Sequence, residues 1–168
     1  MRNVFNHYRI DQDYVIADTL FIPGEKLSNL PISTPFTFPI FKNKVVLAKD
    51  KMNWWNPLGG HIFQGESWKE ALTREAYEEA GIKIDNIRIF GYIKVTKLLD
   101  HPNNQYPPLS QIPMTVSNVV YVDKKWQPQE TFARTIVTYA KAEEMLKQRT
   151  DNQQMWQILQ YLKSLRLV

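Results

Sequence analysis

The stretch GHIFQGESWKEALTREAYEEAGI, residues 60–82, is the most informative part of this chain. It predicts a helix with an unusual arrangement of charges. Ser67 and Glu70 have the spacing of a capping box, in which two side chains satisfy free backbone N–H groups, so we expect the helix to begin at Trp68. Gly81 is expected to end it, since glycine readily takes the left-handed conformation of a C-terminal cap. The acidic residues of this helix therefore lie near its C-terminal end.

Three of these acids, Glu75, Glu78 and Glu79, share one face of the predicted helix. Residues three or four positions apart are neighbours on a helix, with Cβ atoms about 5–6 Å apart, and unit charges at that distance repel by roughly 3 kcal/mol per pair at an effective dielectric constant of 20. The negative end of the helix dipole also disfavours acids there. Arg74 offsets little of this repulsion. We therefore favour a bound cation over a solvated charged face.

One stripe along the helix is apolar, and this stripe orients the acids. A stripe at steps of four is expected to be buried against a sheet, about a quarter-turn from the carboxylates; it consists of Trp68, Leu72, Ala76 and Ala80. The acids then face a cleft. Gly59 and Gly60 precede the helix and, lacking side chains, let a backbone amide approach a ligand closely.

The spacing of the whole stretch matches a family pattern: Gly, five residues, Glu, seven residues, Arg-Glu, an aliphatic, any residue, Glu-Glu, any residue, Gly, an aliphatic. The identities are Gly60, Glu66, Arg74, Glu75, Glu78, Glu79 and Gly81, with Ala76 and Ile82 in the aliphatic positions. Ala76 is smaller than is usual there. The stretch Gly60 to Ile82 resembles the Nudix box of the Nudix hydrolase family.

The resemblance implies roles for the conserved positions of the pattern. Glu75, Glu78 and Glu79 are similar to the metal ligands, and Arg74 to the residue that orients Glu75. Glu66 is similar to the glutamate that braces the loop through the arginine.

The family often adds one acid from beyond the box, as a metal ligand or general base. Glu130, in QPQETFARTIV, is the first choice here because it precedes a short apolar run by a spacing similar to that in relatives, and Asp123 is the second. An ordinary surface acid in a turn is the alternative for either residue.

A set of oxygen ligands selects a hard cation, so Mg²⁺ is the expected cofactor, with Mn²⁺ as its substitute. Zinc is not expected, because the chain has no cysteine and its three histidines, His7, His61 and His101, are far apart in sequence.

Substrate-binding candidates surround the box. Gly59 and Gly60 would admit a phosphate, and His61 can donate to a phosphate oxygen or bond locally in its loop. Trp55 stands where family members often carry a tryptophan, although the proline of the following turn is displaced by one position. Tyr106 lies in a predicted loop from Asp100 to Pro113 and can stack on a base or belong to a solvated turn. Further aromatic candidates, which can equally be core residues, are Trp54, Phe63 and Tyr92.

Alternation of strands and helices predicts an α/β/α sandwich around a mixed sheet, which the resemblance also implies. The expected strands are 13–22, 37–41, 44–49, 87–98, 114–123 and 131–139, and the expected later helices are 141–148 and a last one from 152. We expect one Nudix domain over residues 1–168, with an N-terminal extension of about residues 1–30 packed on or flanking it.

Composition narrows the function classes. We expect a cytoplasmic protein without a membrane span, because the chain has no cysteine, starts with a polar stretch and lacks a long apolar run. The net charge of +4 assists anionic substrates, but no basic cluster indicates stable nucleic-acid binding. A homodimer is an expectation from the family alone.

The resulting hypothesis is a metal-dependent hydrolase that cleaves a phosphoanhydride in a nucleoside diphosphate linked to another group. The alternative is a Nudix-fold module that binds or senses a nucleotide without turnover. The sequence leaves the substrate open among nucleoside triphosphates, ADP-ribose, dinucleoside polyphosphates, nucleotide sugars and NADH, because divergent loops choose it.

Overall fold

A mixed sheet forms the centre of the computed structural model, which describes residues 8–12, 15–99, 107–149 and 153–167. Its strand order is β1-β2-β7-β8-β3-β4-β5, with β6 beside β3 and β9 beside β4. β3 and β8 are parallel, and the other described pairs are antiparallel. The strands are β1 (Tyr8–Gln12), β2 (Val15–Pro23), β3 (Phe36–Phe41), β4 (Lys44–Lys49), β5 (Trp55–Asn56), β6 (Leu58–Gly59), β7 (Ile82–Leu99), β8 (Leu109–Val122) and β9 (Ala133–Val137).

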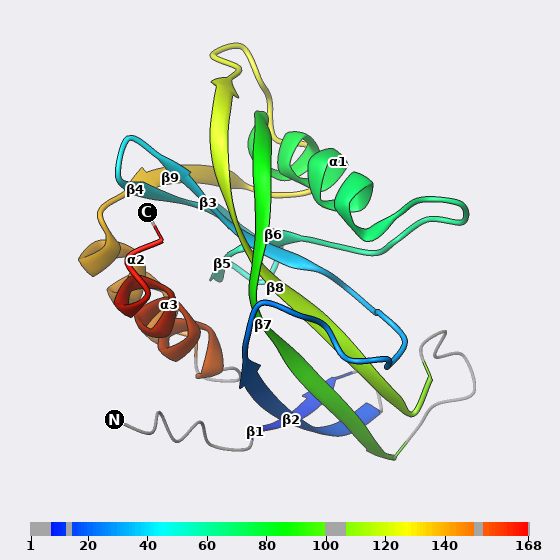
Figure 1. Cartoon of the computed structure of the whole chain (residues 1–168). Helices are drawn as coiled ribbons and strands as arrows, with labels where there is room; N and C mark the ends of the chain where they lie inside the picture. Colours follow the sequence, from blue (N-terminus) through cyan, green and yellow to red (C-terminus); the bar gives the residue numbers. More distant parts are fainter. Residues whose placement is uncertain (1–7, 13–14, 100–106, 150–152, 168) are drawn as a thin grey trace.

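Helices cover both faces of this sheet (Figure 1). α1 (Trp68–Ala80) lies on one face, and α2 (Tyr139–Lys147) and α3 (Gln154–Ser164) lie together on the other. Each face has its own buried cluster: Leu72 and Ala76 of α1 pack with Val46 of β4, while Ile158 of α3 packs with Phe38 of β3. The predicted α/β/α sandwich is confirmed.

Local signals in the sequence were sufficient for several elements. The capping box of Ser67 and Glu70 is present, and Gly81 ends α1 with φ 57° and ψ 39°. Lys42 and Asn43 both have positive φ, 49° and 61°, as the tight turn between β3 and β4 requires. These predictions depended on neighbours within a few residues, and they are confirmed.

Other boundaries differ from the sequence prediction. β7 begins at Ile82 rather than 87, and β8 begins at Leu109 rather than 114, so residues 109–113 of the loop predicted over 100–113 are strand. Pro113 pairs with Tyr92 inside this long ladder, because cross-strand pairing outweighs the local turn signal of proline. Tyr106 lies outside the described residues. Trp68 is only partly buried, and Ala71 joins the buried stripe of α1 instead.

The N-terminal part of the chain enlarges the sheet. β2 pairs with β7, and β1, which was not predicted, pairs with β2. The expected N-terminal extension therefore contributes strands at the β7 edge, on the side of β7 away from β8. Among the described helices, none is long and apolar enough to cross a membrane.

Gly81 offers a test of how tightly α1 is held at its C-terminal end. A Cβ at this position would lie 2.2 Å from Cγ of Trp126, whereas a Cβ at Gly65, which also has positive φ, would meet nothing within 4 Å. Gly65→Ala should lower the free energy of unfolding by about 1 kcal/mol, the cost of a left-handed alanine. Gly81→Ala should lower it by at least about 2 kcal/mol, because overpacking adds to that cost. Urea unfolding measures both; equal losses would show that Trp126 does not pack on Gly81.

Candidate active site

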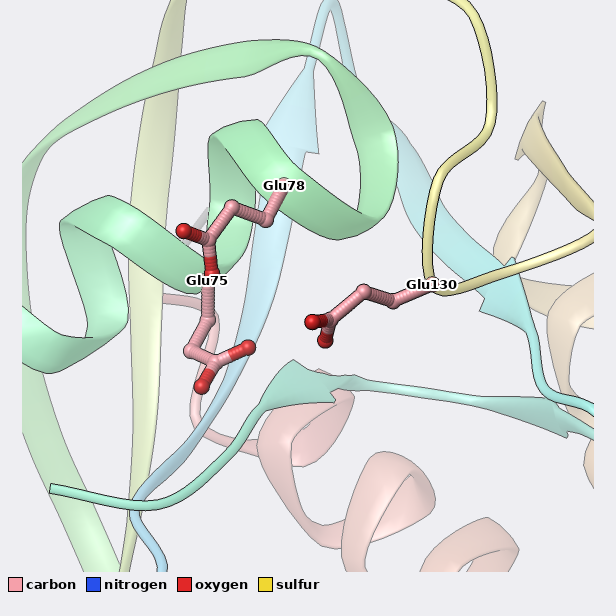
Figure 2. Close-up of side chains that lie close together, drawn as sticks. All are labelled: Glu75, Glu78 and Glu130. Carbon is pink, nitrogen blue, oxygen red and sulfur yellow. The ribbon is translucent and has the colours of Figure 1, made fainter.

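Three carboxylates converge in one open pocket (Figure 2). Glu75 and Glu78 come from α1 and Glu130 from the connection between β8 and β9, and each offers an oxygen within 4.8 Å of the others. The pocket has a volume of about 410 Å³, and its other lining residues are His61, Ile62, Phe63 and Arg74. The structure therefore brings Glu130, the first choice for the additional acid, beside Glu75 and Glu78.

Glu75 is the buried member of the cluster, at 6% exposure. Its carboxylate lies where a side chain of Gly60 would be, since a Cβ there would approach Oε1 of Glu75 to 2.1 Å. Burial raises the pKa of Glu75, although the adjacent Arg74 guanidinium opposes this. Gly60 is thus required for close packing of the loop on the helix, in addition to any role toward a ligand.

Arg74 connects the loop and the acids. Its Nε and Nη2 donate to the two oxygens of Glu66 at 2.9 and 3.1 Å, and its Nη1 donates to Glu75 at 2.9 Å and Glu78 at 2.8 Å. Nη2 also donates to the backbone carbonyl of His61 at 2.8 Å. Hydrogen bonding to Glu66 raises the pKa of Arg74, and the same pairing lowers the pKa of Glu66. The guanidinium stays charged, and the bracing contact expected between Arg74 and Glu66 is present.

Glu79 lies apart from the three-acid group. Its Oε2 accepts a hydrogen bond from the backbone N–H of Gly59 at 2.9 Å. Burial raises the pKa of Glu79 to about 8; the Gly59 N–H opposes the rise, and the charges of Glu75, Glu130 and Asp50 add to it. Of the three helix acids proposed as ligands, Glu75 and Glu78 are therefore gathered with Glu130, while Glu79 is directed to Gly59.

Asp123, the second choice for the additional acid, is engaged elsewhere. It accepts from the hydroxyl of Tyr77 at 3.0 Å and from the backbone N–H of Lys125 at 2.8 Å. Hydrogen bonding to Lys125 and Tyr77 lowers its pKa. Tyr77 is two positions beyond Glu75, about 200° around a helix, so Asp123 lies on the far side of α1 from the pocket.

Of the aromatic candidates, one lines the acidic pocket and another lies outside it. Phe63 lines the acidic pocket and is 59% exposed, with Cζ of Arg74 4.0 Å from its ring centre. Trp55 is partly buried against the larger core cluster, with Nζ of Lys49 5.4 Å from its ring centre. Trp55 is not among the residues that line the acidic pocket, and His61, which lines it, is exposed.

A second pocket, of about 200 Å³, lies between the sheet and α3. It combines apolar walls with polar groups and is lined by Thr19, Thr34, Phe36, Asn56, Pro57, Ile93, Ile112, Arg149, Gln154 and Met155. Arg149 donates to Oδ1 of Asn56, and Asn56 donates to Asp50 at 2.7 Å. Sequence reasoning missed this pocket because its residues come from distant segments without a shared motif.

The two pockets are neighbours along one short segment. Asn56 and Pro57 line the second pocket, and residues 61–63 line the acidic one. The chain therefore passes from the second pocket to the acidic one within a few residues.

The donor set of the acidic pocket fits a hard divalent cation. Its oxygens belong to carboxylates on two separate segments, one acid is buried, and the pocket is open on one side to further ligands. Mg²⁺ typically combines one or two carboxylates with waters and substrate oxygens. The pocket offers the carboxylates and leaves space for the other ligands.

Comparison with known proteins agrees with the box. The family model described as NUDIX domain matches residues 36–162. The pyrophosphohydrolase BsRppH of Bacillus subtilis has a similar structure, with a TM-score of 0.68 and 17% identity, covering 96% of this chain and 99% of that one. A Nudix hydrolase from Nitrosomonas europaea has a TM-score of 0.61 and 17% identity, covering 81% of this chain and 90% of that one.

A shorter sequence match is to the NAD-capped RNA hydrolase NudC of Mannheimia succiniciproducens, 44% identical over 41 residues. The matched segment is 24% of this chain and 15% of that relative. The structural neighbours show the fold, and the family model covers most of the chain. The chain therefore belongs to the Nudix hydrolase family.

Proposed function

We propose that this protein is a metal-dependent hydrolase that cleaves a phosphoanhydride bond in a nucleoside diphosphate linked to another group. The observation that carries the proposal is the convergence of Glu75, Glu78 and Glu130 within 4.8 Å in an open pocket. Such a cluster is electrostatically costly without a cation, and the anhydride is the substrate part that a cation bound there would neutralise.

Glu75, Glu78 and Glu130 would hold Mg²⁺, with Mn²⁺ as its substitute. Glu79 stays a candidate ligand, since its carboxyl is close enough to Glu75 and Glu130 for their charges to raise its pKa. When bound, the ion would neutralise negative charge on the phosphate oxygens and lower the pKa of a water. Glu130, which is exposed, is also the candidate for the general base that accepts a proton from an attacking water.

The residues around the acids hold the carboxylates in position. Arg74 is locked by the two oxygens of Glu66, and it holds Glu75 and Glu78 from one side. Little reorganisation is then needed as the substrate reacts, which is how preorganised polar sites accelerate phosphoryl transfer.

We infer that the second pocket is the candidate site for the nucleoside part of the substrate. Phe36, Pro57 and Met155 give apolar walls for a flat ring, while Asn56 and Arg149 place polar groups beside it. Apolar pockets with a few oriented polar groups are typical of small-molecule sites. The chain leaves this pocket at Pro57 and reaches the acidic pocket at His61.

The second candidate function is a binding or sensor module that holds a nucleotide without turnover. The complete set of box acids favours hydrolysis, because a module without chemistry has no need to keep the carboxylates close together.

A hydrolysis screen tests the proposed function. The panel contains nucleoside triphosphates, ADP-ribose, dinucleoside polyphosphates, nucleotide sugars and NADH, with NAD-capped RNA added because of the similarity to NudC. We expect Mg²⁺-dependent products from at least one compound, identified by mass to locate the broken bond, and none with EDTA. Saturable binding of a nucleotide with no product from any compound would establish the sensor alternative.

The acids of the pocket can be tested by an isosteric change. Glu78→Gln should lower kcat by at least about 10²-fold, a loss of roughly 2.7 kcal/mol of barrier stabilisation, because the amide cannot replace the charge. Glu144→Gln is the control, since Glu144 is an exposed glutamate that pairs with Lys141 on α2. Near-normal turnover of Glu78→Gln would contradict its assignment.

The raised pKa of Glu79 predicts how stability changes with pH in the metal-free protein. Its ordinary value of 4.5 rises to about 8 on folding, so the folded state favours the proton. The stabilising effect of the protonated form is complete below pH 4.5 and is lost as the pH rises through 8. We therefore expect this contribution to the free energy of unfolding in EDTA to fall between those values.

Glu79→Gln isolates this contribution. Glutamine cannot ionise and still offers an oxygen to the N–H of Gly59, so the stability of this variant should vary less with pH over the same range. Urea unfolding at a series of pH values measures the slopes of the two proteins. Parallel curves would show that Glu79 does not titrate between its ordinary value and 8.

A further inference from the structure

The segment that carries Glu130 is bound to the last turn of α1 by the residue that follows it. Thr131 is 6% exposed, and its hydroxyl donates to the backbone carbonyl of Glu79 at 2.7 Å. Arg134 donates to the carbonyls of Ala80 and Gly81 at 2.5 and 3.2 Å. Successive carbonyls at the end of the helix therefore all accept from this segment.

Further contacts fix the start of the same connection. The N–H of Asp123 donates to the carbonyl of Gly81 at 2.8 Å, and Arg134 donates to the carbonyl of Asp123 at 2.6 Å. Trp126 lies against Gly81, with Cζ of Arg134 5.2 Å from its ring centre. The connection is thus held to α1 both before and after Glu130.

Physical chemistry explains why the end of α1 attracts these donors. The last carbonyls of a helix lack partners within the helix and form its negative end. α1 has no basic residue in its last turn, so Arg134 supplies the positive charge from β9, and Thr131 supplies a neutral hydroxyl. Of the two, Thr131 is adjacent to Glu130 in the chain and bonds to the residue that follows Glu78 in α1.

We propose that Thr131 is a positioning residue that holds Glu130 opposite Glu75 and Glu78. Its hydroxyl ties the main chain beside Glu130 to the same helical turn that carries Glu78, so the distance between the acids depends on this hydrogen bond. The inference rests on the proposed function, because it requires that Glu130 contribute to the cation site.

The test is a double-mutant cycle read out as Mn²⁺ affinity, measured by isothermal titration calorimetry on the full chain. Glu130→Gln should weaken Mn²⁺ binding, and Thr131→Val should weaken it by about tenfold, a usual effect of removing a partner that orients a ligand. The double variant should bind no more weakly than Glu130→Gln. Thr131→Ser keeps the hydroxyl and should restore the affinity.

Thr73→Val is the matched control, because Thr73 also donates to a backbone carbonyl, that of Lys69 at 3.0 Å, on an exposed part of α1. It should leave Mn²⁺ binding unchanged. If Thr131→Val does not fold, Thr131→Ala and Thr131→Ser replace it, since both are smaller than threonine and differ by the hydroxyl alone.

The outcomes separate the two proposals. If Glu130→Gln weakens binding but the loss of the Thr131 hydroxyl does not, or if the two effects simply add, the positioning role is overturned and the proposed site stands. If Glu130→Gln itself has no effect on Mn²⁺ affinity, the assignment of Glu130 to the site is wrong, and the role of Thr131 falls with it.

Discussion

The ion-pair network of Arg74 is the interaction on which the candidate site depends. One guanidinium contacts the carboxylates of Glu66, Glu75 and Glu78 and also the carbonyl of His61. It therefore joins the loop before α1 to the acidic face of α1. A single positive charge cannot balance these acids together with Glu130, so the pocket remains strongly anionic. The contacts of Arg74 hold the loop in place but leave a net negative charge in the pocket, which a bound cation would neutralise.

Close packing provides the second constraint. Glu75 is buried because Gly60 has no side chain, and the end of α1 is covered because Gly81 leaves room for Trp126. The apolar stripe of α1 is buried against the sheet at the same time. The acidic face is thus held in place by contacts of α1 with the sheet, with the loop before the helix and with the connection after β8. A carboxylate cluster held from three directions is preorganised for a ligand.

The sequence predicts the features that depend on residues close together in the chain, and it misses those that depend on distant contacts. Helix α1 and the turn at Lys42 and Asn43 follow from residues close in the chain, and the spacing of the box acids gave the family. Glu130 was proposed from the family pattern rather than from a local signal. The early starts of β7 and β8 depend on pairing between distant strands, and the contacts of Thr131 with α1 and of Arg149 with Asn56 cross 52 and 93 positions. A hydroxyl or guanidinium in one sequence does not show which distant carbonyl it will meet.

The most direct test of the metal site is the position of a bound ion. Crystals grown with Mn²⁺ and a non-hydrolysable nucleotide would give an anomalous difference peak at the manganese. We predict a peak at coordination distance from carboxylate oxygens of Glu75 and Glu78, on the side that faces Glu130. A nucleotide bound without any peak between these acids, or a peak only at other residues, would contradict the metal site.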